Sequence, residues 1–101
     1  MRVEYSKDFE KSVRKLSGKS LHSVIAMIDE VKSALTVDDI TDCKKIESLK
    51  NVYRIRVGNK RAFFVLHILI EGNVARFEYL VSRGEAYDKK NMERLRNRDI
   101  E

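Results

Sequence analysis

The stretch YRIRVGNKRAFFVLH, residues 53–67, alternates apolar and charged side chains, turns, and then continues as an apolar run. Side chains alternate between the two faces of a strand, so the apolar and the basic residues of its first half separate. The two sets are Tyr53, Ile55 and Val57 on one face, and Arg54 and Arg56 on the other. Gly58-Asn59 suits a hairpin turn, and RAFFVLHILI, residues 61–70, predicts the next strand. The stretch therefore predicts an antiparallel hairpin with one apolar face and one basic face.

The segment before this hairpin predicts a strand and two helices. MRVEYS, residues 1–6, alternates like a short strand. Ser6 can cap a helix whose apolar positions Phe9, Val13 and Leu16 share a face, and Gly18 is placed to end it. Residues 20–35 keep the apolar spacing of three and four that a second amphipathic helix requires. A tight turn between the two helices predicts an αα-hairpin.

The remaining segments complete an α+β fold in one domain, residues 1–101. Residues 36–43, TVDDITDC, have no period and predict a loop, whereas residues 71–73 predict a turn and residues 74–82 a further strand. Residues 86–99 predict a short charged helix or a fraying tail. We expect an N-terminal strand, the αα-hairpin, and an antiparallel meander of three or more strands. Both helices should pack on one sheet face and leave the other open, with Arg54 and Arg56 on the open face.

Composition excludes several classes of protein. The chain is 43% hydrophobic and 37% charged, which is typical of a globular domain and not of a disordered one. It has no apolar run of the length of a membrane span and no signal-peptide pattern at its start, so we expect a cytoplasmic protein that binds no membrane. One cysteine and two isolated histidines predict neither an internal disulfide nor a metal site, and no cofactor is expected.

The positive charge is concentrated in one segment. Residues 44–61 contain seven basic residues and one acid, a net charge of +6, while the whole chain carries +5. Such a segment favours a polyanionic partner, with nucleic acid first, although a solvated basic face has the same composition.

YRIRVGNKRAFFVL, followed by SRGEAY at residues 82–87, resembles the RelE/ParE family of bacterial toxin-antitoxin toxins, as does the opening YSKDFEKSVRKL. The resemblance covers nearly the whole chain. It implies a metal-free endoribonuclease that cuts mRNA, commonly in the ribosomal A site, and a cognate antitoxin that masks the basic face. The active-site positions of RelE-type enzymes fall on five residues here. They are Arg54, Arg56, Arg61, Arg83 and Tyr87. The first two are often lysines in the family.

Arginine suits only part of the chemistry that this resemblance implies. RNA cleavage without a metal needs a base for the 2′-OH, cations for the phosphate and a proton for the 5′-oxygen. A guanidinium binds phosphate with two parallel hydrogen bonds but stays protonated, so it is a poor base. We therefore assign Arg61 and Arg83 to the scissile phosphate. Tyr87 either takes the proton, since nearby guanidinium groups favour a phenolate, or stacks on and orients a base.

Other residues are predicted to bind RNA or to play no chemical part. The predicted contacts to the RNA backbone are Arg54, Arg56, Lys45, Lys50 and Lys60. Glu47 and Glu85 are expected to pair with basic side chains, His67 to be structural and Cys43 to be inert. Two other functions fit the same residues: a ParE-like protein that inhibits DNA gyrase, and a degenerate member that only binds nucleic acid or an antitoxin. Mapping of RNA ends and a gyrase assay separate them.

Overall fold

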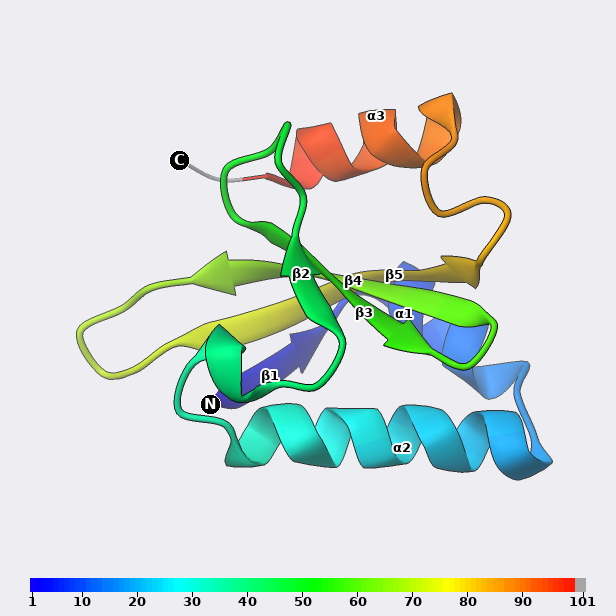
Figure 1. Ribbon diagram of the computed structural model, residues 1–101, viewed down its shortest axis with the longest axis horizontal. Coiled ribbons are helices and arrows are strands. Elements are labelled where there is room, and N and C mark those ends of the chain that lie inside the picture. The colour runs from blue at the N-terminus through cyan, green and yellow to red at the C-terminus, as the bar shows by residue number, and fades with distance from the viewer. Residues whose placement is uncertain (100–101) are drawn as a thin grey trace.

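A computed structural model describes residues 1–99 as a five-stranded sheet with helices on both faces (Figure 1). The strands are β1 (Arg2–Tyr5), β2 (Cys43–Lys45), β3 (Val52–Val57), β4 (Lys60–His67) and β5 (Val74–Ser82). Their order in the sheet is β1-β5-β4-β3-β2, with β1 parallel to β5 and every other neighbour antiparallel. The helices are α1 (Lys7–Arg14), α2 (Gly18–Ser33) and α3 (Lys89–Arg98), with a short 3-10 turn at Val37–Asp39. The predicted α+β class is confirmed.

The hairpin of β3 and β4 has the predicted turn. Val57 is opposite Lys60, so Gly58 and Asn59 form a two-residue turn, and Gly58 takes the positive φ of 60° that such turns require. Arg54 lies opposite Phe63, and Arg56 lies opposite Arg61. Directly opposite residues of a ladder share a face, so these four side chains are on the same side of the sheet.

A capping residue explains where α1 begins. The Ser6 Oγ accepts a hydrogen bond from the Phe9 amide at 3.0 Å, which confirms the predicted cap of α1. The same hydroxyl donates to the Glu78 carbonyl of β5 at 2.6 Å and so ties the helix start to the sheet. Helix α1 ends at Arg14, before the predicted Leu16, and Gly18 opens α2 with a φ of 56°. The two helices are therefore separated by a three-residue turn.

The first sheet face carries the larger core. Helices α1 and α2 cover it, as predicted, and their apolar faces meet the side chains of β3, β4 and β5 (Figure 1). Members of this core include Phe9, Val24, Val31, Ile55, Phe64 and Phe77. Tyr53 stacks on Phe64 with ring centroids 5.4 Å apart. The apolar side of the opening stretch is thus buried under helices.

The second sheet face is not open, contrary to the sequence-based expectation. Of the two alternatives predicted for residues 86–99, the short charged helix forms, as α3, but it lies across this face, on the side opposite α2 (Figure 1). Beneath it a second apolar cluster is buried, consisting of Ile46, Leu49, Val52, Phe63, Val65, Tyr79, Ala86 and Leu95. The pattern of α3 is dominated by charge, and only Leu95 and Asn91 on it are buried. Arg54 and Arg56 lie beside this cluster, on the part of the face toward β2.

Polar contacts fix both ends of α3. The Asp88 side chain accepts from the Asn91 amide at 2.8 Å and caps its start. Near its end, Arg98 donates to the buried Glu78 carboxylate of β5 at 2.6 Å. The Asp99 carboxylate accepts from the amides of Lys50 and Asn51 at 2.7 and 2.9 Å. Hence the helix is joined to the sheet and to the segment that precedes β3.

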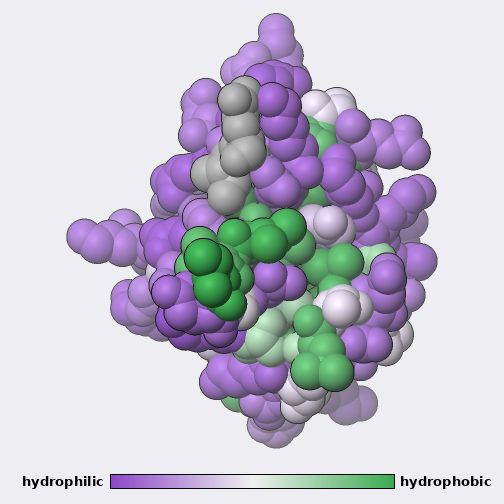
Figure 2. Space-filling view, turned by 90° about the vertical axis from the view of Figure 1, so that its left-hand side faces the viewer, coloured by the Kyte–Doolittle hydropathy of each residue, from purple (hydrophilic) through white to green (hydrophobic). Residues whose placement is uncertain are grey.

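The β4–β5 connection is longer than predicted. Strand β4 ends at His67, and Ile68, Leu69 and Ile70 are exposed, because the ladder pairing with β5 stops at His67 and Val74. Leu35, after α2, is also exposed. Figure 2 shows hydrophobic side chains gathered on the side of the molecule from which this connection projects. Within residues 1–99, no helix has the length and apolar character that crossing a membrane requires.

Candidate active site

Arg54 is held between β2 and the turn that precedes α3. Its Nη2 donates to the Asp42 carbonyl at 3.3 Å, and its Nη1 donates to the Tyr87 hydroxyl at 3.4 Å, a long hydrogen bond. Asp42 adopts a positive φ of 55°, which Asp tolerates better than most residues, and this turns its carbonyl toward β3. The Arg54 Nε is buried without an acceptor among the described residues. A buried unsatisfied donor costs about 1–3 kcal/mol, so this guanidinium is kept at some expense of stability.

Arg56 and Arg61 place two positive charges side by side. They are direct cross-strand partners, and like charges in such positions repel. Arg61 is nearly buried, and its Nη1 donates to the carbonyls of Gly58 and Lys60 at 3.1 and 2.9 Å. These bonds fix its guanidinium at the hairpin turn, whereas Arg56 is exposed. An anion that bridges the two would relieve their repulsion.

Arg83 lies next to the same hairpin turn. It follows β5 in an exposed turn, and its amide donates to the Asn59 carbonyl at 2.9 Å. Its backbone is therefore anchored while its side chain is exposed. The hairpin turn thus has Arg61 on one strand and Arg83 beside its tip.

Tyr87 is fixed by its neighbours although the residue is 55% exposed. The Asn91 side chain is buried and donates to the Ala86 carbonyl at 2.7 Å, and Asp88 caps α3 immediately after the tyrosine. The ring meets Phe63 edge-on, with centroids 6.3 Å apart. The phenol oxygen consequently lies beside Arg54. The next residue of β3 on the same face is Arg56, whose cross-strand partner is Arg61.

Within residues 1–99, the arginines of this face have no acidic partners. Among the described residues, ion pairs are formed by arginines elsewhere, namely Arg2, Arg14, Arg76 and Arg98. No described carboxylate lies within ion-pair distance of Arg54, Arg56, Arg61 or Arg83. We define these four residues and Tyr87 as the arginine face. An unpaired cationic surface with several fixed guanidinium groups is suited to bind phosphates.

The structure separates the three predicted lysines from one another. The Lys45 ammonium donates to the carbonyls of Ile46 and Leu49, which makes it part of the loop before β3. Lys50 lies beside the end of α3, where its amide binds Asp99. Lys60 is opposite Val57, on the helix side of the hairpin, and lines a cleft beside α1. None of the three is placed on the arginine face by its register or contacts.

Sequence reasoning missed Lys44. It lies in β2 directly opposite Arg54, so its exposed side chain shares the arginine face. The signal was too weak to find, because a three-residue strand after a loop shows no measurable alternation. Lys44 adds a cation at the outer edge of the sheet.

The other candidates are not part of the arginine face. Glu85 accepts from the Ser82 hydroxyl at 2.7 Å, within its own turn. Glu47 is exposed in the loop before β3. His67 is at the far end of β4, opposite Val74. Among residues 1–99, no group of three or more His, Cys, Asp and Glu side chains is arranged to hold a metal ion.

Cys43 lies in the edge strand β2, and its thiol is protonated at neutral pH. Burial raises the pKa of its thiol to about 11, outweighing the opposite effect of the Arg54 charge. The thiolate is the nucleophile, so at pH 8 we expect iodoacetamide to modify native Cys43 about tenfold to a hundredfold more slowly than an ordinary cysteine. The measured rate should keep rising with pH to near 11. Chain unfolded in urea serves as the control, and a native rate that levels off below pH 9 would contradict the raised pKa.

Comparison with known proteins identifies the family. The chain matches no family model. Toxin RelE3 of Methanocaldococcus jannaschii is 32% identical to it over 89 residues, which span 87% of this chain and 97% of that toxin. The chain belongs to the RelE family of toxins.

Solved structures agree with this membership. The RelB-RelE antitoxin-toxin complex from Methanococcus jannaschii contains a chain 26% identical to this RelE-family toxin, with a TM-score of 0.64 over 85% of this chain and 96% of the matched one. A free E. coli RelE variant with two arginines replaced by alanine has a TM-score of 0.66 over 98% and 97% of the two chains. At 14% identity this second likeness shows the fold alone. The predicted RelE-like fold and family are confirmed.

Proposed function

We propose that this RelE-family toxin cleaves mRNA by attack of a 2′-OH on the adjacent phosphate, in the context of the ribosome. The observation that carries the proposal is the arginine face, where unpaired guanidinium groups adjoin a tyrosine whose hydroxyl accepts from Arg54. Guanidinium groups fixed before the reaction stabilise negative charge as it develops on phosphate oxygens. The 2′-OH that the reaction requires is present in RNA and missing from DNA.

The residues of the arginine face have different roles in the proposed cleavage. Arg61 and Arg83 bind the non-bridging oxygens of the scissile phosphate from the two sides of the hairpin turn. The Tyr87 oxygen accepts the 2′-OH proton, since no guanidinium can do so at neutral pH. The 2′-oxygen forms a bond to phosphorus, the bond to the 5′-oxygen breaks, and the leaving oxygen takes a proton from solvent. The products are a 2′,3′-cyclic phosphate and a 5′-OH end.

The proposal also assigns the path of the RNA strand and a protein partner. Arg54, Arg56 and Lys44 bind the RNA backbone on the β2 side of the site. Arg54 and Arg56 lie along β3, and Lys44 lies opposite Arg54 on β2. A RelB-type antitoxin is the proposed protein partner, because relatives were crystallised as RelB-RelE complexes. It would compete with RNA for the unpaired arginines. The exposed apolar residues around Ile68 and Leu35 give it further surface to cover.

Mapping of RNA 5′ ends after induction tests the proposed function. We expect new 5′-OH ends within translated messages, absent when translation initiation is blocked and absent from the uninduced culture. Purified toxin should cut an mRNA in programmed ribosomes, and a 2′-deoxy substitution at the mapped position should abolish that cut. A gyrase supercoiling assay is the second arm. Inhibited supercoiling with an unchanged set of RNA ends would replace the proposal with a ParE-like function.

A further inference from the structure

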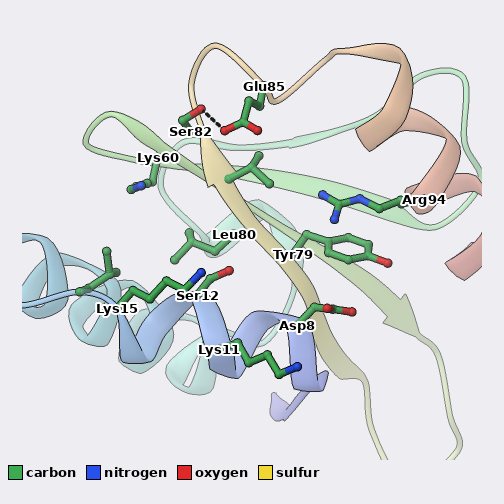
Figure 3. Close-up of a pocket in the computed structure, with 12 residues that line it drawn as sticks. Asp8, Lys11, Ser12, Lys15, Lys60, Tyr79, Leu80, Ser82, Glu85 and Arg94 are labelled. Carbon is green, nitrogen blue, oxygen red and sulfur yellow. Dashed lines mark hydrogen bonds between the residues drawn. The ribbon is translucent and has the colours of Figure 1, made fainter.

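A basic cleft lies outside the arginine face. It has a volume of about 500 Å³ and runs between α1, the outer half of β5 and α3 (Figure 3). Strand β1 pairs with β5 only as far as Phe77, so the edge of β5 beyond that point is left to this cleft. The volume is within the range of small-molecule sites, about 300–1,000 Å³.

The charges that line this cleft favour an anion. Its cations are Lys11, Lys15, Lys60 and Arg94, and its acids are Asp8 and Glu85. Both acids are already engaged, Asp8 by Arg98 at 3.6 Å and Glu85 by the Ser82 hydroxyl at 2.7 Å. In contrast, the three lysines have no hydrogen bond or ion pair of their side chains within residues 1–99. Figure 3 shows Lys11 and Lys15 on the α1 side and Lys60 across from them on the hairpin.

The cleft also contains a surface on which a base can stack. The Arg94 guanidinium carbon lies 4.1 Å from the centroid of the Tyr79 ring, and Asn91 holds its Nη2 at 3.0 Å. Figure 3 shows the guanidinium extending from α3 toward that ring. Unstacked RNA bases pack on guanidinium planes as well as on aromatic rings. A lysine row opposite a fixed guanidinium therefore suits a nucleotide better than an isolated phosphate.

The cleft is continuous with the arginine face along the chain. Lys60 directly precedes Arg61, and Ser82 directly precedes Arg83. The two sites therefore meet at the ends of β4 and β5, beside the hairpin turn. A strand whose phosphate is held by Arg61 and Arg83 can pass over this end of the sheet into the cleft.

We propose that the cleft between α1 and β5 binds the RNA strand next to the scissile phosphate, with Lys11, Lys15 and Lys60 on its backbone phosphates and Arg94 under a base. This inference rests on the proposed function for its choice of RNA. An acidic protein segment is the competing occupant, and the continuity with the phosphate-binding arginines favours RNA over it.

Binding of a non-cleavable strand tests this inference apart from catalysis. The probe is a fluorescein-labelled, fully 2′-O-methylated RNA oligonucleotide of about twelve nucleotides, and its Kd is measured by anisotropy between 50 and 300 mM salt. The test variant is Lys11→Ala/Lys15→Ala. The control, Lys7→Ala/Lys19→Ala, removes the same charge from exposed residues outside the cleft. Melting curves establish that both variants are folded.

The expected result is a change in the salt dependence. Each phosphate contact of a single strand contributes about 0.7 to the slope of log Kd against log salt, so the test variant should lose about 1.4 and bind about three- to tenfold more weakly at low salt. The control should keep most of its slope. Equal slopes in the two variants would overturn the inference, as would absence of RNA binding by the wild type.

Three further outcomes separate the hypotheses. Poly-L-glutamate that binds as tightly as RNA, and loses affinity equally in the test variant, would assign the cleft to an acidic protein and overturn the RNA assignment. Loss of slope in the test variant, together with no RNA cleavage by the wild type, would support the cleft and reject the proposed function. RNA cleavage by the wild type, together with an unchanged slope in the test variant, would support the proposed function and overturn the assignment of the cleft.

Discussion

Tyr87→Phe is expected to slow ribosome-dependent mRNA cleavage by about 10²- to 10⁴-fold, the usual contribution of a general base. The change removes only the hydroxyl that accepts from Arg54 at 3.4 Å and keeps the ring that packs edge-on against Phe63. More than half of the side chain is exposed, so the fold should be unaffected. Single-turnover rates on programmed ribosomes, with Kd for the ribosome measured separately, give the result.

The control for this change is Tyr53→Phe, which removes a phenol oxygen from the opposite sheet face. Tyr53 stacks on Phe64 in the core under the helices, and its variant should cleave at the wild-type rate. If Tyr87→Phe is equally active while Tyr87→Ala is not, the ring acts by stacking and another group takes the 2′-OH proton. That outcome would remove the proton-transfer role and retain the position of Tyr87 in the site.

The fold was predictable wherever one period governed a segment. The period of two in residues 53–57 specified which side chains meet the helices, and Ser6 specified where α1 begins. The covered second face was not predictable, because α3 is mostly charged and its attachment depends on a few distant partners. Arg98 reaches Glu78 across twenty residues, and Asp99 reaches Lys50 across nearly fifty. Such contacts leave no local pattern.

The candidate site, like the fold, was predictable only in part. Alternation alone placed Arg54 and Arg56 on one face, and the family resemblance supplied Arg61, Arg83 and Tyr87. The lysines were chosen from the charge of one segment, which contains no information on direction. Backbone register then separated Lys60 from Arg61, its neighbour in sequence, because adjacent residues of a strand point to opposite faces.

Leu95→Ala is expected to lower the free energy of unfolding by about 2–5 kcal/mol, the range for buried leucines. Leu95 is fully buried and is the main apolar contact of α3 with the second cluster, where it packs near Phe63 and Tyr79. Polar bonds at the two ends of the helix are retained in the variant, so they do not offset the lost burial. Urea denaturation followed by circular dichroism measures the loss.

The effect should extend from stability to the site, because α3 and the turn that precedes it share the Asn91–Ala86 hydrogen bond and the Asp88 cap. A loosened α3 would therefore leave Tyr87 less well held over Arg54, and cleavage by the variant should fall further on warming than cleavage by the wild type. Leu35→Ala is the matched control, since that leucine is 85% exposed and its loss should change stability by less than about 0.5 kcal/mol. Equal unfolding free energies for the two variants would mean that α3 is held by its polar ends and that the second cluster contributes little.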